Sequence, residues 1–515
     1  MLVKLAPILS GLLLLALVGC NGGEEAATGT PSGTGTPAAT GSPRATPATG
    51  AHGAKGFTIL VDSWGDTDSR DGFLTLREAI LIANGQLAVA DLDSDEKDNV
   101  GGKPGAESAD TIGFFTEAFP ADAPASISLT STLPTMSGGN DTLDGSAAGV
   151  IINGGKGGFD CLHIASSGNT IKGLQIQNCL TGVVLEMAAA NNTIGGSAKG
   201  ARNVISGNDA VGIRIESSGN VVQGNYIGTD PSGTAANPNE MEGIWIAPGG
   251  QNNIIGGSKP EERNILSGNG LFGVSLDGQG TTGNVVKGNY IGVDVSGRKG
   301  LRNRYGMVLV NGPQGNTIGG SDPADANIIS GNQSGGILIR SAGTSNNLII
   351  GNYIGTDASE SEPLGNGTGI WILEGANGNI IGSTTAGEGN VIAHNLIYAV
   401  QVDSPETTGN QIRGNSIYAS AREGIMNKEG GAGGIAAPKL TAANPITGTA
   451  CPNCNVDIYS DDADEGKVYE GSTQADAEGR FTFDEAPSGP YVTAIAVDAA
   501  GNTSAFSIPL SVPRT

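Results

Sequence analysis

The chain is poor in several residue types that would point to particular chemistry. Among its 515 residues only three are His and six are Met, and aromatic residues make up 4%. Three His without a Met cluster argue against a copper-handling protein. Lys and Arg total 27 against 51 Asp and Glu, giving a formal net charge of −24. This negative field disfavours nucleic acid and the unaided binding of anionic polymers, although Ca²⁺ would reverse it locally.

Long apolar runs are also scarce. One run follows Lys4 and ends in the sequence Leu-Val-Gly-Cys at Cys20, and it is too short for a comfortable membrane span. The pattern resembles a bacterial lipoprotein signal (1–19), which implies export and lipid anchoring through Cys20 at the cell surface or outer membrane. An ordinary signal peptide with a chance cysteine is the alternative. Residues 20–55, rich in Gly, Thr, Pro and Ala, predict a disordered tether.

Glycine and a repeating motif are what the chain has in excess. Gly accounts for 85 residues, and a run close to Asn-apolar-Ile/Val-x-Gly recurs along the chain. The copies start at Asn169, Asn192, Asn220, Asn253, Asn284, Asn316, Asn347, Asn379 and Asn410. Their spacing rises from 23 residues to 28 and then settles at 31 to 33, a period typical of a solenoid.

Each repeat contains three short β-branched runs separated by Gly, Asn and Ser. Apolar positions alternate within each run, as in Gly212-Ile-Arg-Ile215, which indicates strands with one buried face. No helical stripe is present and Leu does not dominate the frame, so helical arrays and leucine-rich repeats are excluded. The sequence therefore predicts an all-β fold, a right-handed, single-stranded parallel β-helix of the pectate-lyase-like kind over residues 136–436.

Asn recurs at the predicted corners of the coils. Such side chains satisfy backbone groups at a bend and tolerate left-handed geometry, so we expect a stacked amide ladder inside the solenoid. The corner residues are Asn208, Asn225, Asn269, Asn289, Asn332, Asn352, Asn395 and Asn415. Loops recur with a double period of 63 or 64 residues. One set starts at Asp230, Asp294 and Asp357, which favours Asx-turns over a Ca²⁺ ladder.

Residues 56–135 depart from the repeat. The sequence Thr-Leu-Arg-Glu78 is a capping box that predicts a helix through Ala83. The run Asp-Gly-Phe-Leu-Thr-Leu-Arg-Glu-Ala-Ile that contains it resembles the N-terminal motif of CSLREA-type bacterial surface proteins, which often precedes β-helix repeats. The Cys of that family is Leu74 here, so any role of the thiol is absent. An amphipathic helix at this place suits a cap over the open end of a solenoid.

An acidic run from Asp91 to Asp98 lies in the same region. Its carboxylates alternate as in a calcium loop, but the Gly and Glu that an EF-hand requires are missing. A looser carboxylate site and a solvated acidic loop both stay open. The sequence therefore assures no cofactor, predicts no particular metal site and leaves Ca²⁺ as a candidate.

Residues 437–515 predict a small β-sandwich. Short alternating runs, such as Phe481-Thr-Phe, lie between turns rich in Gly, Asp and Asn. The sequence that starts at Asp498, Asp-Ala-Ala-Gly-Asn-Thr-Ser, resembles the ending of bacterial Ig-like modules on surface proteins. This resemblance implies a module that acts as a spacer or covers the last coil.

The cysteines form two candidate pairs besides Cys20. Cys451 and Cys454 fit a tight disulfide in an exported domain or half of a metal site, and the lack of a second C-x-x-C or a nearby His favours the disulfide. Cys161 and Cys179 fall near one corner of adjacent coils, where they are placed to pair.

Aligning the third strand of each coil places one column of side chains on the solvent face of the solenoid. The column reads His163, Val184, Arg214, Trp245, Ser275, Val308, Leu338, Trp371 and Gln401. Glu186 and Glu216 lie beside it on neighbouring coils, with Cα atoms about 5 Å apart. With Arg214 they form a candidate catalytic set for a glycoside, in which the two carboxylates act as acid and nucleophile. A solvated charged face is the alternative.

Trp245, Trp371 and His163 are the candidate ligand-binding residues. The two indoles lie four coils apart on the column, and an exposed indole can stack on a sugar ring because it is rigid and apolar with a polar edge. Cover by neighbouring loops is the alternative for both. His163 stands alongside the glutamate pair and completes its polar cluster.

Right-handed β-helices include pectate lyases, polygalacturonases, alginate epimerases and phage tailspikes, and the fold alone does not choose among them. The clustered Ca²⁺-binding acids of the lyases are missing from the sequence, as are the Asp pairs and Gly-His-Gly element of the hydrolases; His394 lacks those flanks. We therefore expect a lipid-anchored cell-surface scaffold that binds carbohydrate or other envelope components. A polysaccharide lyase or glycoside hydrolase is the alternative.

Overall fold

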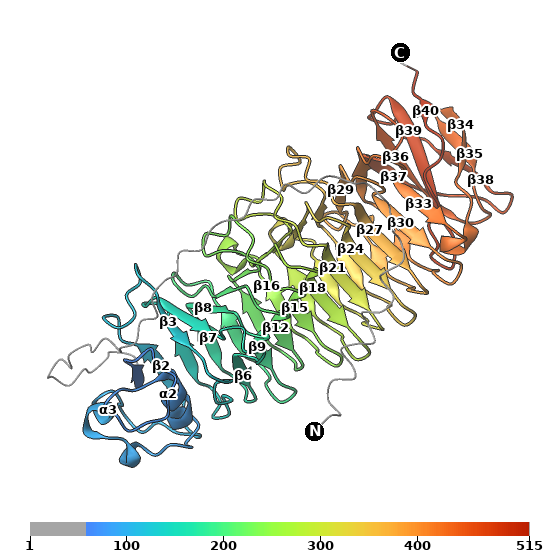
Figure 1. The fold of residues 1–515 in the computed structure, drawn as a ribbon. Helices are drawn as coiled ribbons and strands as arrows, with labels where there is room; N and C mark the ends of the chain where they lie inside the picture. The colour runs from blue at the N-terminus through green and yellow to red at the C-terminus, as the bar shows by residue number, and fades with distance from the viewer. Residues whose placement is uncertain (1–57, 514–515) are drawn as a thin grey trace, which may run out of the picture. The chain divides into compact units, whose positions relative to one another are not determined.

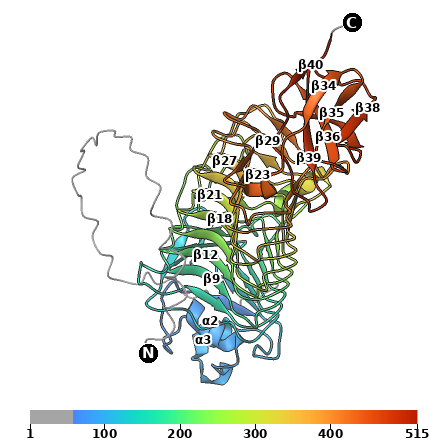
Figure 2. The same cartoon turned by 90° about the vertical axis from the view of Figure 1, so that its right-hand side faces the viewer.

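The computed structural model describes residues 58–513. The predicted signal peptide, Cys20 and the tether lie outside the described residues and stay predictions. Most of the described chain winds into a right-handed parallel β-helix with three long parallel sheets, which confirms the predicted fold class (Figure 1). Strands of one sheet lie above one another along the solenoid, as β9, β12, β18 and β21 do in Figure 2.

The three sheets take one strand each from successive coils. The first sheet contains β1 (Ile59–Val61), β2 (Thr111–Phe114), β4 (Thr142–Asp144), β7 (Thr170–Lys172), β10 (Thr193–Gly195), β13 (Val221–Gln223), β16 (Ile254–Gly256), β19 (Val285–Lys287), β22 (Thr317–Gly319), β25 (Leu348–Ile350), β28 (Ile380–Ile381) and β31 (Gln411–Ile412). The second contains β3 (Ala125–Ser128), β5 (Val150–Asn153), β8 (Leu174–Gln177), β11 (Val204–Ile205), β14 (Tyr226–Ile227), β17 (Ile265–Leu266), β20 (Tyr290–Ile291), β23 (Ile328–Ile329), β26 (Tyr353–Ile354), β29 (Val391–Ala393) and β32 (Ser416–Tyr418). The third contains β6 (Leu162–Ile164), β9 (Thr181–Leu185), β12 (Val211–Ile215), β15 (Glu242–Ile246), β18 (Phe272–Asp277), β21 (Tyr305–Val310), β24 (Gly335–Arg340), β27 (Thr368–Leu373), β30 (Val400–Asp403) and β33 (Ile425–Lys428).

The core is a set of aliphatic columns inside the coils. In the first sheet Ile194 pairs in register with Ile171 on one side and Val222 on the other, and all three side chains are fully buried. One apolar position per short strand suffices, because each side chain packs on its equivalents one coil above and one below. The buried columns run without interruption through the solenoid and join the N-terminal helix region to the last coil.

Three Asn ladders, not one, follow the corners of the coils. In each rung the Oδ1 atom accepts the side-chain N–H of the equivalent Asn one coil earlier, and in most rungs also its backbone N–H, as Asn284 does for Asn253 at 3.0 and 2.9 Å. The first ladder is Asn169, Asn192, Asn220, Asn253, Asn284, Asn316, Asn347, Asn379 and Asn410. The second is Asn203, Asn225, Asn264, Asn289, Asn327, Asn352, Asn390 and Asn415. The third is Asn208, Asn239, Asn269, Asn303, Asn332, Asn366 and Asn395.

The predicted corner residues therefore do form stacked amides, but they do not belong to a single ladder. These eight residues divide between the second and third ladders and supply only alternate rungs of each. The prediction for the loops is confirmed: Asp230 Oδ1 accepts the backbone N–H groups of Thr234 and Ala235, each at 2.9 Å. Asp357 Oδ1 accepts the equivalent N–H groups of Ser361 and Glu362, and Asp294 Oδ1 accepts the backbone N–H of Ser296 at 3.0 Å.

The N-terminal end of the solenoid is closed by helix α2 (Leu76–Ala83). Thr75 is its N-cap and forms a capping box with Glu78, as the sequence predicts. Leu76 and Ile80 are fully buried and join the solenoid core, and the helix packs on β1 and β2. The predicted capping segment thus supplies both the cover and the first strands of the sheets.

The acidic run of the same region forms a short helix, α3 (Ser94–Asp98), and not an open loop. Asp93 caps it by accepting the backbone N–H groups of Asp95 and Glu96, each at 2.9 Å. The buried Glu96 carboxylate accepts the backbone N–H of Asp71 at 3.1 Å. These carboxylates are therefore held by local hydrogen bonds. The remaining short helical turns are η1 (Val89–Asp91), η2 (Pro260–Glu262), η3 (Pro323–Asp325) and η4 (Gly431–Gly434).

The C-terminal segment is a β-sandwich of two small antiparallel sheets, as predicted. Its strands are β34 (Lys439–Ala443), β35 (Ile446–Thr449) and β38 (Arg480–Phe483) in one sheet, and β37 (Val468–Gln474), β36 (Asn455–Asp461), β39 (Tyr491–Val497) and β40 (Leu510–Ser511) in the other. The predicted disulfide Cys451–Cys454 is formed, and Cys161 and Cys179, whose pairing the sequence leaves open, are also bonded.

The sandwich covers the last coil through the motif near its end. The backbone N–H of Ile412 donates to Thr503 Oγ1 at 2.9 Å, and the backbone N–H of Gly409 donates to Asn502 Oδ1 at 2.7 Å. The Nε atom of Arg413 donates to the buried Asp457 carboxylate at 2.8 Å. The edge of β31 is therefore satisfied by side chains in place of a further coil.

One buried carboxylate stands at the head of the first Asn ladder. Asp141 occupies the rung before Asn169 and is 1% exposed. Its Oδ1 atom accepts the backbone N–H of Asp110 at 3.0 Å, but its Oδ2 atom finds no hydrogen-bond partner among the described residues. Burial, with the charge of Asp110, raises the pKa of Asp141 to about 6.

We predict that Asp141→Asn stabilises the protein at alkaline pH, because an amide replaces an unpaired buried carboxylate. The folded-state pKa is raised from 3.8, so the ionised wild-type side chain lowers the free energy of unfolding as pH rises through about 6. Thermal and denaturant unfolding at pH 8 should show a gain of about 1–3 kcal/mol that shrinks below pH 4. Asn169→Asp, one rung further on, is the matched control and should destabilise; equal pH profiles for Asp141→Asn and wild type would contradict the account.

Candidate functional site

The register of the third sheet confirms the predicted outward column. His163 pairs with Val184, Val184 with Arg214, and Arg214 with Trp245. The pairing continues through Ser275, Val308, Leu338, Trp371 and Gln401. The flanking residues of each strand, such as Ile213 and Ile215, are fully buried in the core. The column therefore faces outward along this whole sheet.

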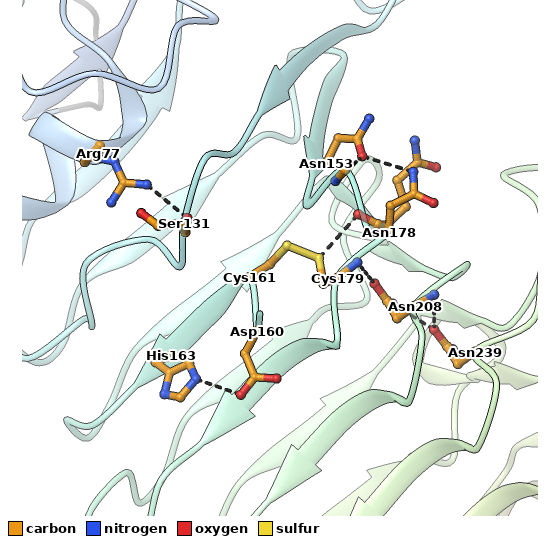
Figure 3. The surroundings of a disulfide bond; sticks show 12 residues. Arg77, Ser131, Asn153, Asp160, Cys161, His163, Asn178, Cys179, Asn208 and Asn239 are labelled. Atoms are coloured by element: carbon orange, nitrogen blue, oxygen red, sulfur yellow. Dashed lines mark hydrogen bonds and ion pairs between the residues drawn. A yellow bond between two sulfur atoms is a disulfide. The ribbon is translucent and has the colours of Figure 1, made fainter. Parts of the chain in front are cut away.

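His163 is held between two carboxylates at the N-terminal end of the column. Its Nδ1 atom lies 2.7 Å from Glu186 Oε1 and its Nε2 atom 3.1 Å from Asp160 Oδ2, the second contact being drawn in Figure 3. The hydrogen bond to Asp160, followed by that to Glu186, raises the pKa of His163 against the effect of burial. Burial would raise the pKa of Asp160, but hydrogen bonds from His163 and Thr181 lower it. Both ring nitrogens are thus engaged within the protein.

The predicted catalytic set is brought together, but each glutamate has its own cation. Glu186 contacts His163, and Glu216 Oε1 lies 3.1 Å from Arg214 Nε. The buried Cys161–Cys179 disulfide ties the first two coils together next to this cluster (Figure 3). The arrangement is a chain of alternating charges, which differs from an isolated pair of carboxylates facing a substrate.

Both predicted tryptophans are partly exposed, and each indole lies beside a carboxylate on the next coil. Trp371 Nε1 donates to Asp403 Oδ2 at 2.9 Å, and Gln401 Nε2 donates to the two oxygens of Asp403 at 2.9 and 2.8 Å. Burial raises the pKa of Asp277, and the neighbouring Asn311 amide and Trp245 indole lower it. The Trp371 indole is therefore fixed in orientation, and part of the surface of each indole is open to solvent.

An apolar cluster lies on the same outer face between the two indoles. Tyr305, Val308 and Leu338 are 7%, 2% and 4% exposed although they point away from the solenoid core. Phe272 packs on Tyr305 with ring centroids 5.9 Å apart, and Trp371 borders the cluster. The column thus changes from charged to apolar along the solenoid.

Sequence reasoning missed Glu242, the most perturbed carboxylate of this face. Glu242 begins β15 and pairs in register with Phe272. Burial, with the charge of Asp277, raises the pKa of Glu242 to about 7. Asp160 was missed as well. Both residues lie just before the aligned strand positions, where the coil bends, so a column built from strand alternation does not include them.

Metal and membrane candidates find no further support in the described part of the chain. Among residues 58–513, no group of three or more His, Cys, Asp or Glu side chains is placed to hold a metal ion. No helix within the same range is long and apolar enough to cross a membrane.

Comparison with known proteins gives similarity of fold only. No protein-family model and no curated protein matches the chain. Similar solved structures include the periplasmic alginate epimerase AlgG (14% identity, 62% of this chain and 66% of that chain, TM-score 0.27). An alginate lyase from Paenibacillus sp. str. FPU-7 matches at 16% identity over 63% of this chain and 89% of its own, with a TM-score of 0.29. A mutant tailspike protein of E. coli bacteriophage HK620, in complex with a pentasaccharide, matches at 11% identity over 75% and 86%, with a TM-score of 0.26.

The coverage of these chains is uneven. The present chain spans about two thirds of the length of the epimerase. The class that the three stacked parallel sheets define is the parallel β-helix, and its activity has to be argued from this chain's own residues.

We predict that His163→Gln destabilises the protein at acidic and neutral pH and not at alkaline pH. The folded-state pKa of His163 is raised above 6.5, so its stabilising contribution is complete below 6.5 and lost as pH rises through the folded-state value. Melting temperatures of variant and wild type should differ at pH 6 and converge by pH 9. His394→Gln is the control: burial and Lys467 lower the pKa of His394, so this change should stabilise at acidic pH. A deficit for His163→Gln that does not change with pH would contradict the ion-pair account.

Proposed function

We propose that the outer face of the third sheet binds a neutral polysaccharide without turnover, on an exported scaffold that a lipid holds at the cell surface. The observation that carries the proposal is the pair of partly exposed indoles, Trp245 and Trp371, on one column, each beside a carboxylate of the next coil. A fixed indole loses little conformational freedom on binding, and its apolar face suits the apolar face of a sugar ring.

The charge of this face favours a neutral chain over a polyanion. Asp277 and Asp403 lie beside the indoles, and their oxygens can accept hydrogen bonds from sugar hydroxyls. A polyuronate would meet these carboxylates and the net charge of −24 as repulsion. Other envelope components with hydroxyl groups and no charge fit the same face.

The attachment and the modules at both ends complete the proposal. The lipobox-like sequence ending at Cys20 supports lipidation, and residues 20–55 supply the tether. The CSLREA-type motif around α2 and the Ig-like ending of the β-sandwich support a bacterial surface protein. In this arrangement the solenoid stands away from the membrane with its third sheet accessible to polymers.

A second candidate function, a glycoside hydrolase or polysaccharide lyase, is favoured by Glu242. A carboxyl group with a pKa of about 7 is half protonated at neutral pH, which suits a general acid. The set Glu186, Glu216 and Arg214 is less suited to the reaction, because both glutamates are paired with cations. Glu242 would therefore be the acid to test in any catalytic account.

We predict retention of the protein by neutral polysaccharides with no change in their chain length. Affinity electrophoresis through glucomannan, xyloglucan, mixed-linkage glucan and dextran, with alginate and polygalacturonate as anionic controls, measures binding. Reducing ends and unsaturated products are assayed in parallel, with and without Ca²⁺. We expect Trp245→Ala and Trp371→Ala to lower retention and Glu242→Gln to preserve it. New reducing ends or unsaturated products that Glu242→Gln abolishes would replace the scaffold with the enzyme.

A further inference from the structure

Two sites on the outer face of the third sheet share one construction. We call them Trp stations: the first is Trp245, Asp277 and Asn311, and the second is Trp371, Asp403 and Gln401. In each, an indole on one coil lies beside a carboxylate on the next coil: Trp371 Nε1 donates to Asp403 Oδ2 at 2.9 Å, and burial raises the pKa of Asp277, which the Trp245 indole lowers. In each, an amide also donates to that carboxylate, from Asn311 Nδ2 at 2.9 Å and from Gln401 Nε2 at 2.8 Å.

The stations occupy equivalent positions two double repeats apart. Register pairing leads from Trp245 to Trp371 in four steps, so about 19 Å separates them at the strand spacing of a β-sheet. The double repeat between them carries Val308 where the stations carry the indole. It also carries Arg340 where they carry the aspartate, and Arg340 forms an ion pair with Glu374. The face therefore offers two separate contact points joined by a buried apolar strip.

We propose that the two Trp stations bind one extended neutral polysaccharide chain at the same time, so that the protein selects long chains over fragments and chain ends. This inference rests on the proposed function. Both stations belong to one continuous sheet whose coils are fixed by backbone pairing and Asn ladders, so their separation does not fluctuate as it would across a flexible linker. Once one station is occupied, the second binds the same chain at a high effective concentration.

The chemistry of each station defines the class of segment that it accepts. The indole offers an apolar plane, and the aspartate beside it offers acceptor oxygens that are only partly used by Trp and amide donors. A ring with one apolar face and hydroxyl donors at its edge matches both groups together. A chain of such rings reaches from one station to the next, whereas a fragment shorter than about 19 Å reaches only one.

The test compares stoichiometry on short oligosaccharides with affinity for intact polymers. Glucomannan, xyloglucan, mixed-linkage glucan and dextran serve as probes, each as intact polymer and as size-graded oligosaccharides, with the full chain in isothermal titration. Fragments too short to span the stations should bind at two sites per protein in wild type and at one site in Trp245→Ala or Trp371→Ala, with unchanged affinity per site. The same single variants should lose about 10²–10⁴-fold in affinity for the polymer, the range by which avidity exceeds a single contact.

Trp64→Ala is the matched control, because Trp64 is 37% exposed and lies in the N-terminal region away from this face. It should change neither readout. Circular dichroism and melting temperature verify the fold of every variant, and Asp403→Asn, which keeps the packing of Trp371, provides a milder change at the second station. Asp403→Asn should lower polymer affinity in the same direction as Trp371→Ala.

A spacing variant tests the geometry directly. Deletion of residues 284–346 removes one double repeat between the stations and joins equivalent positions of the repeat, because Asn284 and Asn347 occupy the same rung type. The deletion also removes Asn311 and brings Glu374 to its position, so it is combined with Glu374→Asn, which restores the amide donor beside Asp277. The separation should fall to about half of 19 Å, and the shortest oligosaccharide that binds with polymer-like affinity should shorten accordingly.

The outcomes separate this inference from the function on which it rests. If no neutral polymer binds, the proposed function is wrong and this inference falls with it. If polymers bind but short fragments bind at one site, or single Trp variants lose affinity equally for fragments and polymers, the scaffold function survives and the two-station inference is overturned. An unchanged length threshold in a folded spacing variant also overturns it.

Discussion

The structure depends on satisfying every backbone group at the corners of a coil only three short strands long. The strands of the solenoid are only two to six residues long, so the bends that join them lie close to the core. The Asn side chains at these bends are buried with it. Three Asn ladders meet this demand, because one side-chain amide accepts from the coil before it and donates to backbone carbonyls. Asn289, for example, donates to the carbonyl of Ile255 at 2.8 Å and to Asn327 Oδ1 at 3.1 Å. A slip of one residue would break three ladders at once, which fixes the register of all three sheets.

The first and last coils lack a neighbour on one side, and the structure pairs their hydrogen-bonding groups differently at the two ends. At the N-terminal end the rung before Asn169 is the acid Asp141, whose second oxygen takes the place of an amide nitrogen. At the C-terminal end Asn502 and Thr503 of the β-sandwich bind the backbone of the last coil. The sandwich therefore acts as the missing next coil for the first sheet, and the motif that resembles an Ig-like ending is part of this contact.

The fold was predictable because the features that define it repeat. The alternation within each strand set the outward column residue by residue, and the capping box set the start of α2. The ladders were only half predicted: Asn203, Asn264, Asn327 and Asn390 follow loops of variable length, so they fall out of alignment with the Asn that close each strand. The side-chain contacts between residues of the outward column and residues beside it could not be predicted from the sequence either. That His163 binds Asp160, or that Trp371 bonds Asp403, depends on side-chain directions at the bends, which a periodic pattern does not contain.

The inner face of the solenoid is constrained by the fold and the outer face is not, and this difference determines where a functional site can lie. Packing restricts the inward positions to residues such as Ile and Val, and the ladders require Asn at the corners. On the outer face of the second sheet, the guanidinium groups of Arg202 and Arg263 lie over the rings of Tyr226 and Tyr290. The outer face of the third sheet is the place where the residue type changes from coil to coil, from a charged cluster through an apolar strip to a second indole. Variation there does not serve the coil, because Val308 and Ser275 support the same register as Trp245 and Trp371. Trp245 and Trp371 are therefore the residues of this face on which the proposed binding depends, although Trp371 also packs against the apolar cluster and donates to Asp403.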